Sequence, residues 1–94
     1  MKEVHLPITK SARRFGYVIW NSKQNADIEF MLSGKDQIQV NFNGFDLGEK
    51  HIDRKYRRIS LGFKFTRALP PDQNMYSMKI NNGILEVKTL NAAK

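Results

Sequence analysis

Along two stretches of the chain, hydrophobic and polar residues alternate with a period of two, the pattern of a β-strand that is buried on one face. QIQVNFN (37–43) and ISLGFKFT (59–66) both follow this pattern. On the polar face of the second stretch lie Ser60, Gly62, Lys64 and Thr66. Its apolar face carries Ile59, Leu61, Phe63 and Phe65. The pattern therefore predicts two strands that each turn one face toward a core.

The clearest hairpin lies near the C-terminus, in MYSMKINNGILEVKTL (75–90). An Asn-Gly dipeptide at 82–83 stands at its centre, where a type I′ turn requires residues that tolerate positive φ. A second Asn-Gly dipeptide, at 43–44, ends the strand at 37–43. The sequence therefore predicts antiparallel pairing across residues 75–90.

Two further strands are expected in the first twenty residues. EVHLPIT (3–9) alternates again, and Pro7 cannot donate a backbone hydrogen bond, so this strand should lie at the edge of a sheet. FGYVIW (15–20) is apolar on both faces and ends at Trp20, the single tryptophan of the chain. Large aromatic side chains are usually buried, and we therefore assign to the core Trp20, Phe42, Phe45, Phe63 and Phe65.

The stretch NSKQNADIEFMLSGKD (21–36) fits two structures. As a helix it has Ser22 or Asn25 as N-cap, acidic residues in its first turn, and Gly34 at its C-terminal end. As a strand, its alternating apolar residues would be Ile28, Phe30 and Leu32. We favour a short helix, because the capping residues support it while the strand rests on only these alternations.

Length and composition are those of one small globular unit. The chain has 94 residues, of which 40% are hydrophobic and 27% charged. It contains no apolar run long enough to span a membrane, no apolar segment typical of a signal peptide and no cysteine. We therefore expect a single domain over residues 1–94, mainly β, built as a small β-barrel with one short helix, in the cytoplasm.

Catalytic chemistry has little support in the sequence. The histidines are His5 and His51, the carboxylates are scattered singly, and no Gly-rich phosphate loop or zinc-protease motif occurs. His51 and Asp53 could share a strand face, but such pairs are usually exposed and inert. We expect no enzyme activity, no bound cofactor and no metal site.

Positive charge is concentrated in one segment of the chain. The formal net charge is +7, and the segment from Lys50 to Arg67 contains a single anion, Asp53. Its cations are Lys50, Arg54, Lys55, Arg57, Arg58, Lys64 and Arg67. Such an excess creates a positive field over about one Debye length. This field could attract nucleic acid, an acidic protein face or an anionic membrane surface.

The composition of residues 51–60, HIDRKYRRIS, favours binding of an anionic polymer. Arginines bind phosphate in a bidentate manner, and Tyr56 among them could stack on a base. The alternative is a charged strand edge that prevents aggregation. Arg13 and Arg14 lie between the first two expected strands, where a loop could bring them beside this cluster. This placement favours binding of an anionic polymer over a charged strand edge.

Residues 9–59 resemble the AbrB-type swapped-hairpin domain of the cradle-loop barrels. In that family a basic turn leads to a G-R-V-x-I-P strand, a short helix and a G-D-x-V-x-V strand. The first part would correspond to Arg13, Arg14, Gly16, Val18 and Trp20, and the last to KDQIQV (35–40). Asn21 stands where the family has proline, and Lys35 where it has glycine. The resemblance implies an interleaved barrel, often dimeric, that binds DNA through Arg13 and Arg14.

A second resemblance points to a different fold. DIEFMLSG, FKFTRALP and MKINNGILEV are similar to three motifs of the α-crystallin domain of small heat-shock proteins. Ser33 replaces a proline, Met78 replaces an alanine, and the order of Arg and Phe is interchanged at Phe65 and Arg67. This resemblance implies a β-sandwich that acts as a chaperone or protein-interaction module.

We expect the protein to bind nucleic acid, double-stranded DNA in preference to RNA, as a transcription-regulator-like protein and possible homodimer. The expected contact residues are Arg13, Arg14, Arg54, Lys55, Tyr56, Arg57 and Arg58, with Lys64 and Arg67 at the periphery. This expectation requires that the arginines near position 13 and those near position 57 meet on one surface.

Overall fold

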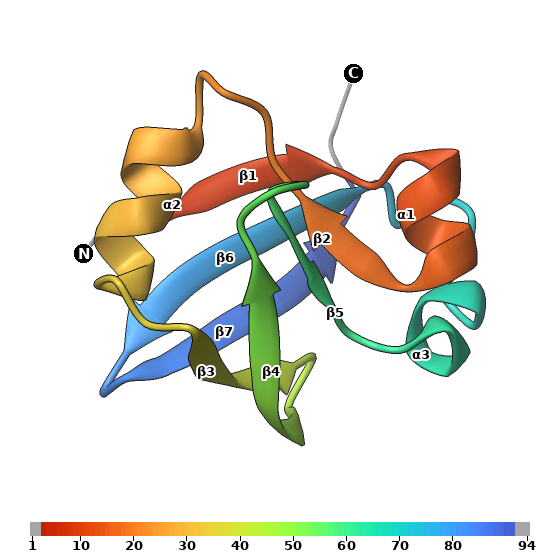
Figure 1. Cartoon of the computed structure of the whole chain (residues 1–94). Helices are drawn as coiled ribbons and strands as arrows, with labels where there is room; N and C mark the ends of the chain where they lie inside the picture. Colours follow the sequence, from red (N-terminus) through yellow and green to blue (C-terminus); the bar gives the residue numbers. More distant parts are fainter. Residues whose placement is uncertain (1–2, 92–94) are drawn as a thin grey trace.

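The computed structural model describes residues 3–91, which form short helices and a single curved sheet (Figure 1). In chain order the elements are β1 (Val4–Pro7), α1 (Lys10–Phe15), β2 (Tyr17–Ile19), α2 (Asn25–Leu32), β3 (Gln37–Phe42), β4 (Phe45–Asp53), β5 (Arg58–Ser60), α3 (Phe63–Arg67), β6 (Met75–Asn81) and β7 (Ile84–Leu90). The expected mainly-β architecture is confirmed. Three short helices are described where the sequence analysis expected one.

Within residues 3–91 seven strands pair in the order β1-β6-β7-β3-β4-β5-β2, and the sheet curves into a nearly closed barrel (Figure 1). Neighbouring strands are antiparallel except β3 and β7, which run parallel. The strand that contains Pro7 lies at one edge of the sheet, as expected, and β2 lies at the other.

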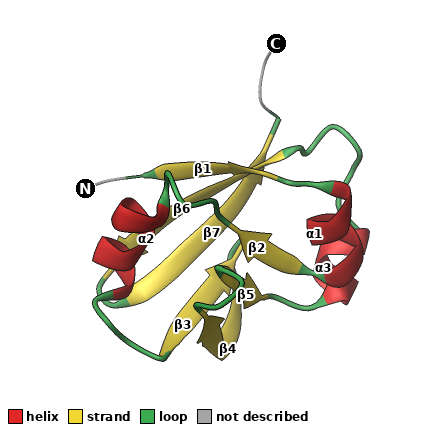
Figure 2. Cartoon of the chain, turned by 45° about the horizontal axis from the view of Figure 1, so that its top comes forward, coloured by secondary structure: helices red, strands yellow, loops and turns green. Residues whose placement is uncertain are grey.

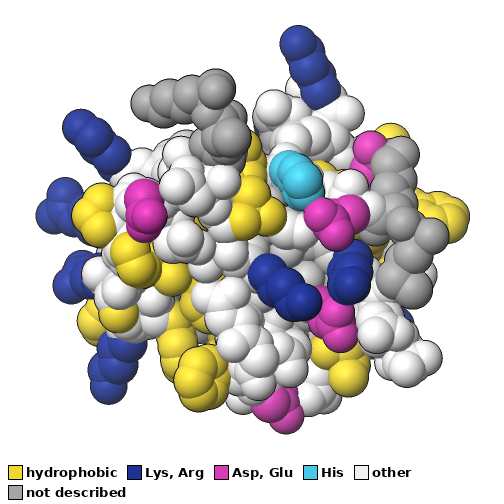
Figure 3. Space-filling view, turned by 180° about the vertical axis from the view of Figure 1, so that it is seen from behind, with side chains coloured by type: hydrophobic (Ala, Val, Ile, Leu, Met, Phe, Trp, Pro, Cys, Tyr) yellow, Lys and Arg dark blue, Asp and Glu magenta, His cyan; other side chains and the backbone are white. Residues whose placement is uncertain are grey.

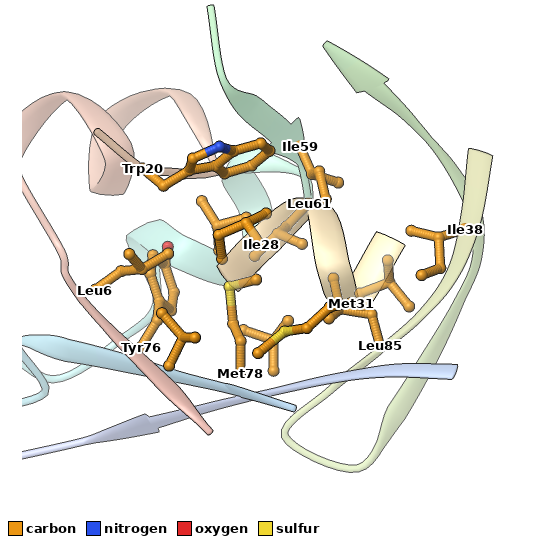
Figure 4. Close-up of a cluster of buried hydrophobic side chains, with 14 of the residues drawn as sticks. Leu6, Trp20, Ile28, Met31, Ile38, Ile59, Leu61, Tyr76, Met78 and Leu85 are labelled. Atoms are coloured by element: carbon orange, nitrogen blue, oxygen red, sulfur yellow. The ribbon is translucent and has the colours of Figure 1, made fainter. Parts of the chain in front are cut away.

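The helices lie at opposite ends of the barrel. Figures 1 and 2 show α2 at one end, and α1 and α3 together at the other. α2 buries Ile28, Met31 and Leu32 among the side chains of the sheet (Figure 4). Trp20 and Phe42 belong to the same core, with 3% and 2% of their surfaces exposed, as the sequence predicts. No helix of the described chain is long and apolar enough to cross a membrane.

Both Asn-Gly dipeptides form the turns that the sequence predicts. Asn82 and Gly83 have φ of 53° and 79° between β6 and β7, and Asn43 and Gly44 have φ of 48° and 90° between β3 and β4. These values match the type I′ turn, which requires positive φ at both central residues.

The ambiguous stretch 21–36 contains a helix, but its ends differ from the expected ones. The N-cap is Gln24, which makes no side-chain capping hydrogen bond, in place of Ser22 or Asn25. The C-cap is Ser33 in the left-handed conformation, one residue before the expected Gly34.

The region around Arg13 and Arg14 is a helix, which corrects the loop that we expected there. The Thr9 side chain accepts a hydrogen bond from the Ala12 amide, and Gly16 ends the helix with φ of 79°. The strand predicted for 15–20 is therefore shorter, and Phe15 belongs to α1.

The strand predicted for 59–66 is also wrong beyond β5. Its backbone leaves the sheet because the Gly16 carbonyl accepts hydrogen bonds from both Leu61 and Gly62, and Gly62 has φ of 111°. The chain then forms α3, which buries Thr66 and exposes Phe63 and Phe65. Phe45, also expected in the core, is exposed beside the β3–β4 turn.

Candidate nucleic-acid interface

Close packing of α1 on α3 brings together basic residues that are far apart in the sequence. Gly16 makes this possible, since a side chain there would overlap the backbone of Gly62 and Phe63. Arg67 Nε donates a hydrogen bond of 3.0 Å to the carbonyl oxygen of Arg14. The exposed side chains of Arg14 and Arg67 therefore start from neighbouring points on the surface.

Arg58 lies in a stack of aromatic rings on the outer face of β5. Its guanidinium carbon lies 5.2 Å from the ring centre of Tyr17 and 4.8 Å from that of Tyr56. Its Nε is 3.5 Å from a carboxylate oxygen of Asp53, and 40% of its side chain is exposed. Cation–π contacts with both rings restrain the guanidinium and leave part of the side chain accessible.

A pocket of about 420 Å³ lies between the end of α1 and the outer face of β5. It is lined by Phe15, Tyr17, Arg58 and Ser60. The Arg14 guanidinium lies 5.3 Å from the ring centre of Phe15, and Phe15 lines this pocket together with Arg58. Of the two predicted groups of arginines, these two members converge on one surface.

Arg13 does not join this surface. Its guanidinium donates hydrogen bonds to the carbonyl oxygens of Leu69 (3.0 Å) and Gln73 (2.6 Å), and its own carbonyl accepts one from the buried Thr66 hydroxyl (2.7 Å). Arg13 thus fixes the loop between α3 and β6 to α1. Arg13 was predicted to contact a ligand, but these hydrogen bonds give it a role in holding the fold together.

Arg54 is also engaged, in its case with carboxylates. Its Nε lies 3.0 Å from Glu29 of α2, and Nη1 lies 3.7 Å from Asp36. Only 33% of the side chain is exposed. These ion pairs attach the β4–β5 turn to α2 and neutralise the charge that was predicted to meet a phosphate.

The rest of the β4–β5 turn is exposed, and its backbone is strained. Arg57 has φ of 53°, and its carbonyl oxygen accepts a hydrogen bond from the Trp20 amide (3.0 Å). Lys55 Nζ lies 5.4 Å from the ring centre of Tyr56, whose surface is 54% exposed. A long, β-carbon-bearing residue in the left-handed region costs about 1–2 kcal/mol, and such strain is common where a side chain must be presented to a ligand.

The peripheral cations lie on α3. Arg67 lies 4.7 Å from the ring centre of Phe63, and Lys64 is exposed beside Phe65. Seen from behind, Lys and Arg side chains are interspersed with hydrophobic ones on the side of the molecule that carries α1 and α3 (Figure 3). We name the whole area the basic–aromatic surface: Arg14, Phe15, Tyr17, Lys55, Tyr56, Arg57, Arg58, Lys64 and Arg67.

Sequence reasoning missed the aromatic part of this surface outside Tyr56. Phe15 and Tyr17 were placed in a strand that is apolar on both faces, yet Phe15 belongs to α1 and is 57% exposed. The signal for a helix was present, since Thr9 is a good N-cap and Gly16 a good C-terminal stop around KSARRF. That helix would have placed Phe15 at an exposed end.

Comparisons of the chain with models of protein families, with curated proteins and with solved structures found no match. Residues 25–32 are helical, as the AbrB-type resemblance implies, but both resemblances stay predictions. Among residues 3–91, no three His, Asp or Glu side chains are grouped as a metal site requires.

Proposed function

We propose that this protein binds nucleic acid through the basic–aromatic surface, as a regulator-like protein without chemistry of its own. One observation carries the proposal. The exposed Phe15 ring lies beside Arg14 and lines, together with Arg58, a pocket whose lining contains no carboxylate. Cations supply phosphate contacts, and exposed rings supply surfaces for bases.

The charge around this pocket supports a polyanionic ligand. Neither α1 nor α3 contains an acidic residue, and together they carry Lys10, Arg13, Arg14, Lys64 and Arg67. Asp53 is the carboxylate paired with Arg58, over a distance of 3.5 Å, and the Asp53 side chain is 34% exposed. A phosphate that binds Arg58 would replace this long, partly exposed contact.

The proposal is tested by fluorescence anisotropy with a labelled DNA duplex at about 50 mM and about 200 mM salt. We expect salt-dependent binding that falls at least about tenfold in the double variant Arg14→Ala plus Arg57→Ala, because each charged contact contributes more than a kcal/mol. Both side chains are exposed and neither is paired with a carboxylate in the described chain, so the fold should be kept.

A matched control removes the same charge at the other end of the barrel. Lys35 and Lys79 lie near α2 and the β6–β7 turn, away from α1 and α3 (Figure 1). Lys35→Ala plus Lys79→Ala should change affinity by less than about threefold. Equal losses in the two double variants would mean that total charge, and not this surface, determines binding.

A second candidate function, a protein-interaction or chaperone-like module, is favoured by one observation. Phe45 and Phe65 lie with ring centres 6.5 Å apart and are 64% and 39% exposed, beside a groove of about 240 Å³. Exposed rings of this kind can dock an apolar segment of another protein. Suppression of the aggregation of an unfolded client, lost in Phe45→Ser plus Phe65→Ser, is the expected result under this function.

A further inference from the structure

The outer face of the β2–β5 pair is a short platform with a pocket at each end. Tyr17 pairs with Ser60 and Ile19 with Arg58, while Val18 between them points into the core. Tyr17 and Ile19 therefore lie on the same outward face, about 7 Å apart along the strand. The pocket of about 420 Å³ lies at the Tyr17 end.

The second pocket lies at the Ile19 end and has a volume of about 320 Å³. Its lining combines the strand end with the β4–β5 turn: Pro7, Thr9, Ile19, Trp20, Asn21, Gln24, Tyr56 and Arg57. Like the first pocket, it has an exposed ring (Tyr56), an exposed cation (Arg57) and no carboxylate in its lining.

The stack of Tyr17, Arg58 and Tyr56 separates the two pockets. The Arg58 guanidinium lies beside both rings, of which Tyr17 lines the first pocket and Tyr56 the second. We infer that this platform binds single-stranded nucleic acid, with one unpaired base in each pocket and Arg58 at the phosphate between them. The inference rests on the proposed function and names the form of its ligand.

The chemistry of the two pockets favours bases over phosphates alone. Flat, exposed rings at Phe15 and Tyr56 offer stacking surfaces, and every base has a face that can stack on them. Ser60 in the first pocket and Asn21 in the second offer hydrogen-bonding groups to a base edge. A duplex keeps its bases stacked inside, so it could use the cations of this surface but not its rings.

The test compares a labelled single strand of about 15 nucleotides, as DNA and as RNA, with the duplex of the same sequence. We expect either single strand to bind at least about tenfold more tightly than the duplex. Phe15→Leu and Tyr56→Leu should each weaken single-strand binding by about fivefold to a hundredfold, because leucine keeps apolar volume but removes the ring. Duplex binding should change by less than about twofold.

Two further variants separate stacking from general damage to the fold. Tyr56→Phe keeps the ring and should keep single-strand affinity within about twofold. Phe30→Leu changes an exposed ring on α2, outside both pockets, and should have no effect. If Tyr56→Phe lost as much affinity as Tyr56→Leu, the ring would not be the binding element and the inference would be wrong.

The single tryptophan gives a direct readout of the second pocket. Trp20 lines this pocket, and its indole Nε1 donates a hydrogen bond of 3.0 Å to Asn25 Oδ1. A base bound there should change Trp20 fluorescence on addition of the single strand, and not on addition of the duplex.

The outcomes keep the inference distinct from the function on which it rests. A duplex bound as tightly as the single strand, with the arginine variants still defective, would overturn the inference and leave nucleic-acid binding in place. No salt-dependent binding to any of these ligands would overturn both.

Discussion

At the scale of single residues, Arg57 is a proposed ligand-binding position whose conformation conflicts with backbone preference. Its φ of 53° lies in the left-handed region, where the other non-glycine residues of the described chain are Ser33, Asn43 and Asn82. Asparagine tolerates this region through its short polar side chain, but arginine has no such advantage. The strained conformation of Arg57 therefore supports the proposal that its side chain binds a ligand.

Arg57→Gly should separate binding from folding. Glycine relieves the strain, so the free energy of unfolding should stay equal or rise by up to about 1 kcal/mol. Nucleic-acid affinity should fall, because the charge is lost while the Trp20-to-Arg57 backbone hydrogen bond remains. Urea unfolding and anisotropy on the same preparation measure both quantities. A parallel loss of stability and affinity would assign Arg57 a structural role.

Tyr76 makes the stability sensitive to alkaline pH. Burial raises the pKa of the Tyr76 hydroxyl from 10.0 to about 12, although the nearby Arg13 charge acts in the opposite direction. Because this pKa is higher in the folded state, the stabilisation is fully present below pH 10 and is lost as the pH rises from 10 toward 12. The loss should amount to about 2–3 kcal/mol.

Tyr76→Phe isolates that effect. The Tyr76 hydroxyl donates a long hydrogen bond of 3.3 Å to the Tyr17 carbonyl. Its removal should therefore lower the free energy of unfolding by about 1 kcal/mol at neutral pH. Between pH 10 and 12 the variant should lose less stability than the original protein. Thermal unfolding at a series of pH values provides the measurement, and identical pH profiles would contradict the assignment.

At the scale of elements, the contact of α1 with α3 depends on Gly16. Alanine there would overlap the backbone of Gly62 and Phe63 and would also be held at φ of 79°. We expect Gly16→Ala to destabilise the protein by about 2–5 kcal/mol, from overpacking and backbone strain together. Loss of this contact would separate Arg14 from Arg67 and should weaken ligand binding as well.

Gly34→Ala is the matched control for that prediction. Gly34 has φ of 72°, but a β-carbon there would meet no neighbouring atom. Only the cost of the backbone conformation remains, about 1–2 kcal/mol. If urea midpoints shifted equally for the two variants, close packing at Gly16 would not be the cause.

The same contact explains which elements could be predicted from the sequence. The β6–β7 hairpin and β3 follow from local patterns, an Asn-Gly turn and an alternation of apolar residues, and both are found. The end of β5 does not follow from a local pattern, because it is determined by hydrogen bonds to the carbonyl of Gly16, more than 40 residues earlier. Alternation continues through Phe63 and Phe65, but there the backbone is helical and the rings are exposed.

The sequence predicted which residues of the candidate site are cations. It did not predict which of these cations are accessible on the surface. A run of basic residues identifies charge, yet Arg54 is adjacent in sequence to Lys55 and differs from it by an ion pair with Glu29 on α2. Arg13 differs from Arg14 in the same way, since its partners are carbonyl groups of the 69–73 loop. Tertiary partners, which no local pattern reports, decide which cations remain accessible.

At the scale of the whole molecule, charge is divided between the two ends of the barrel. Helices α1 and α3 carry no acidic residue, whereas near α2 the acidic residues Asp27, Glu29 and Asp36 are mixed with Lys23, Lys35 and Arg54. Under the proposed function, this difference would favour approach of a polyanion to the basic–aromatic surface, an effect that acts over about one Debye length. Association should therefore slow as salt rises, in addition to the loss of affinity.

The salt dependence of affinity counts the phosphates that the surface can engage. The cations of this surface without a carboxylate partner are Arg14, Lys55, Arg57, Lys64 and Arg67, and Arg58 has one at 3.5 Å, Asp53. If all of them contact a single strand, the slope of log affinity against log salt should be about −4, and shallower by about 0.7 for each one replaced by alanine. Because Arg13 and Arg54 are engaged within the fold, Arg54→Ala should leave the slope unchanged while it lowers stability. A slope steeper than about −5, or one that becomes shallower in Arg54→Ala, would mean that these internal ion pairs open when nucleic acid binds.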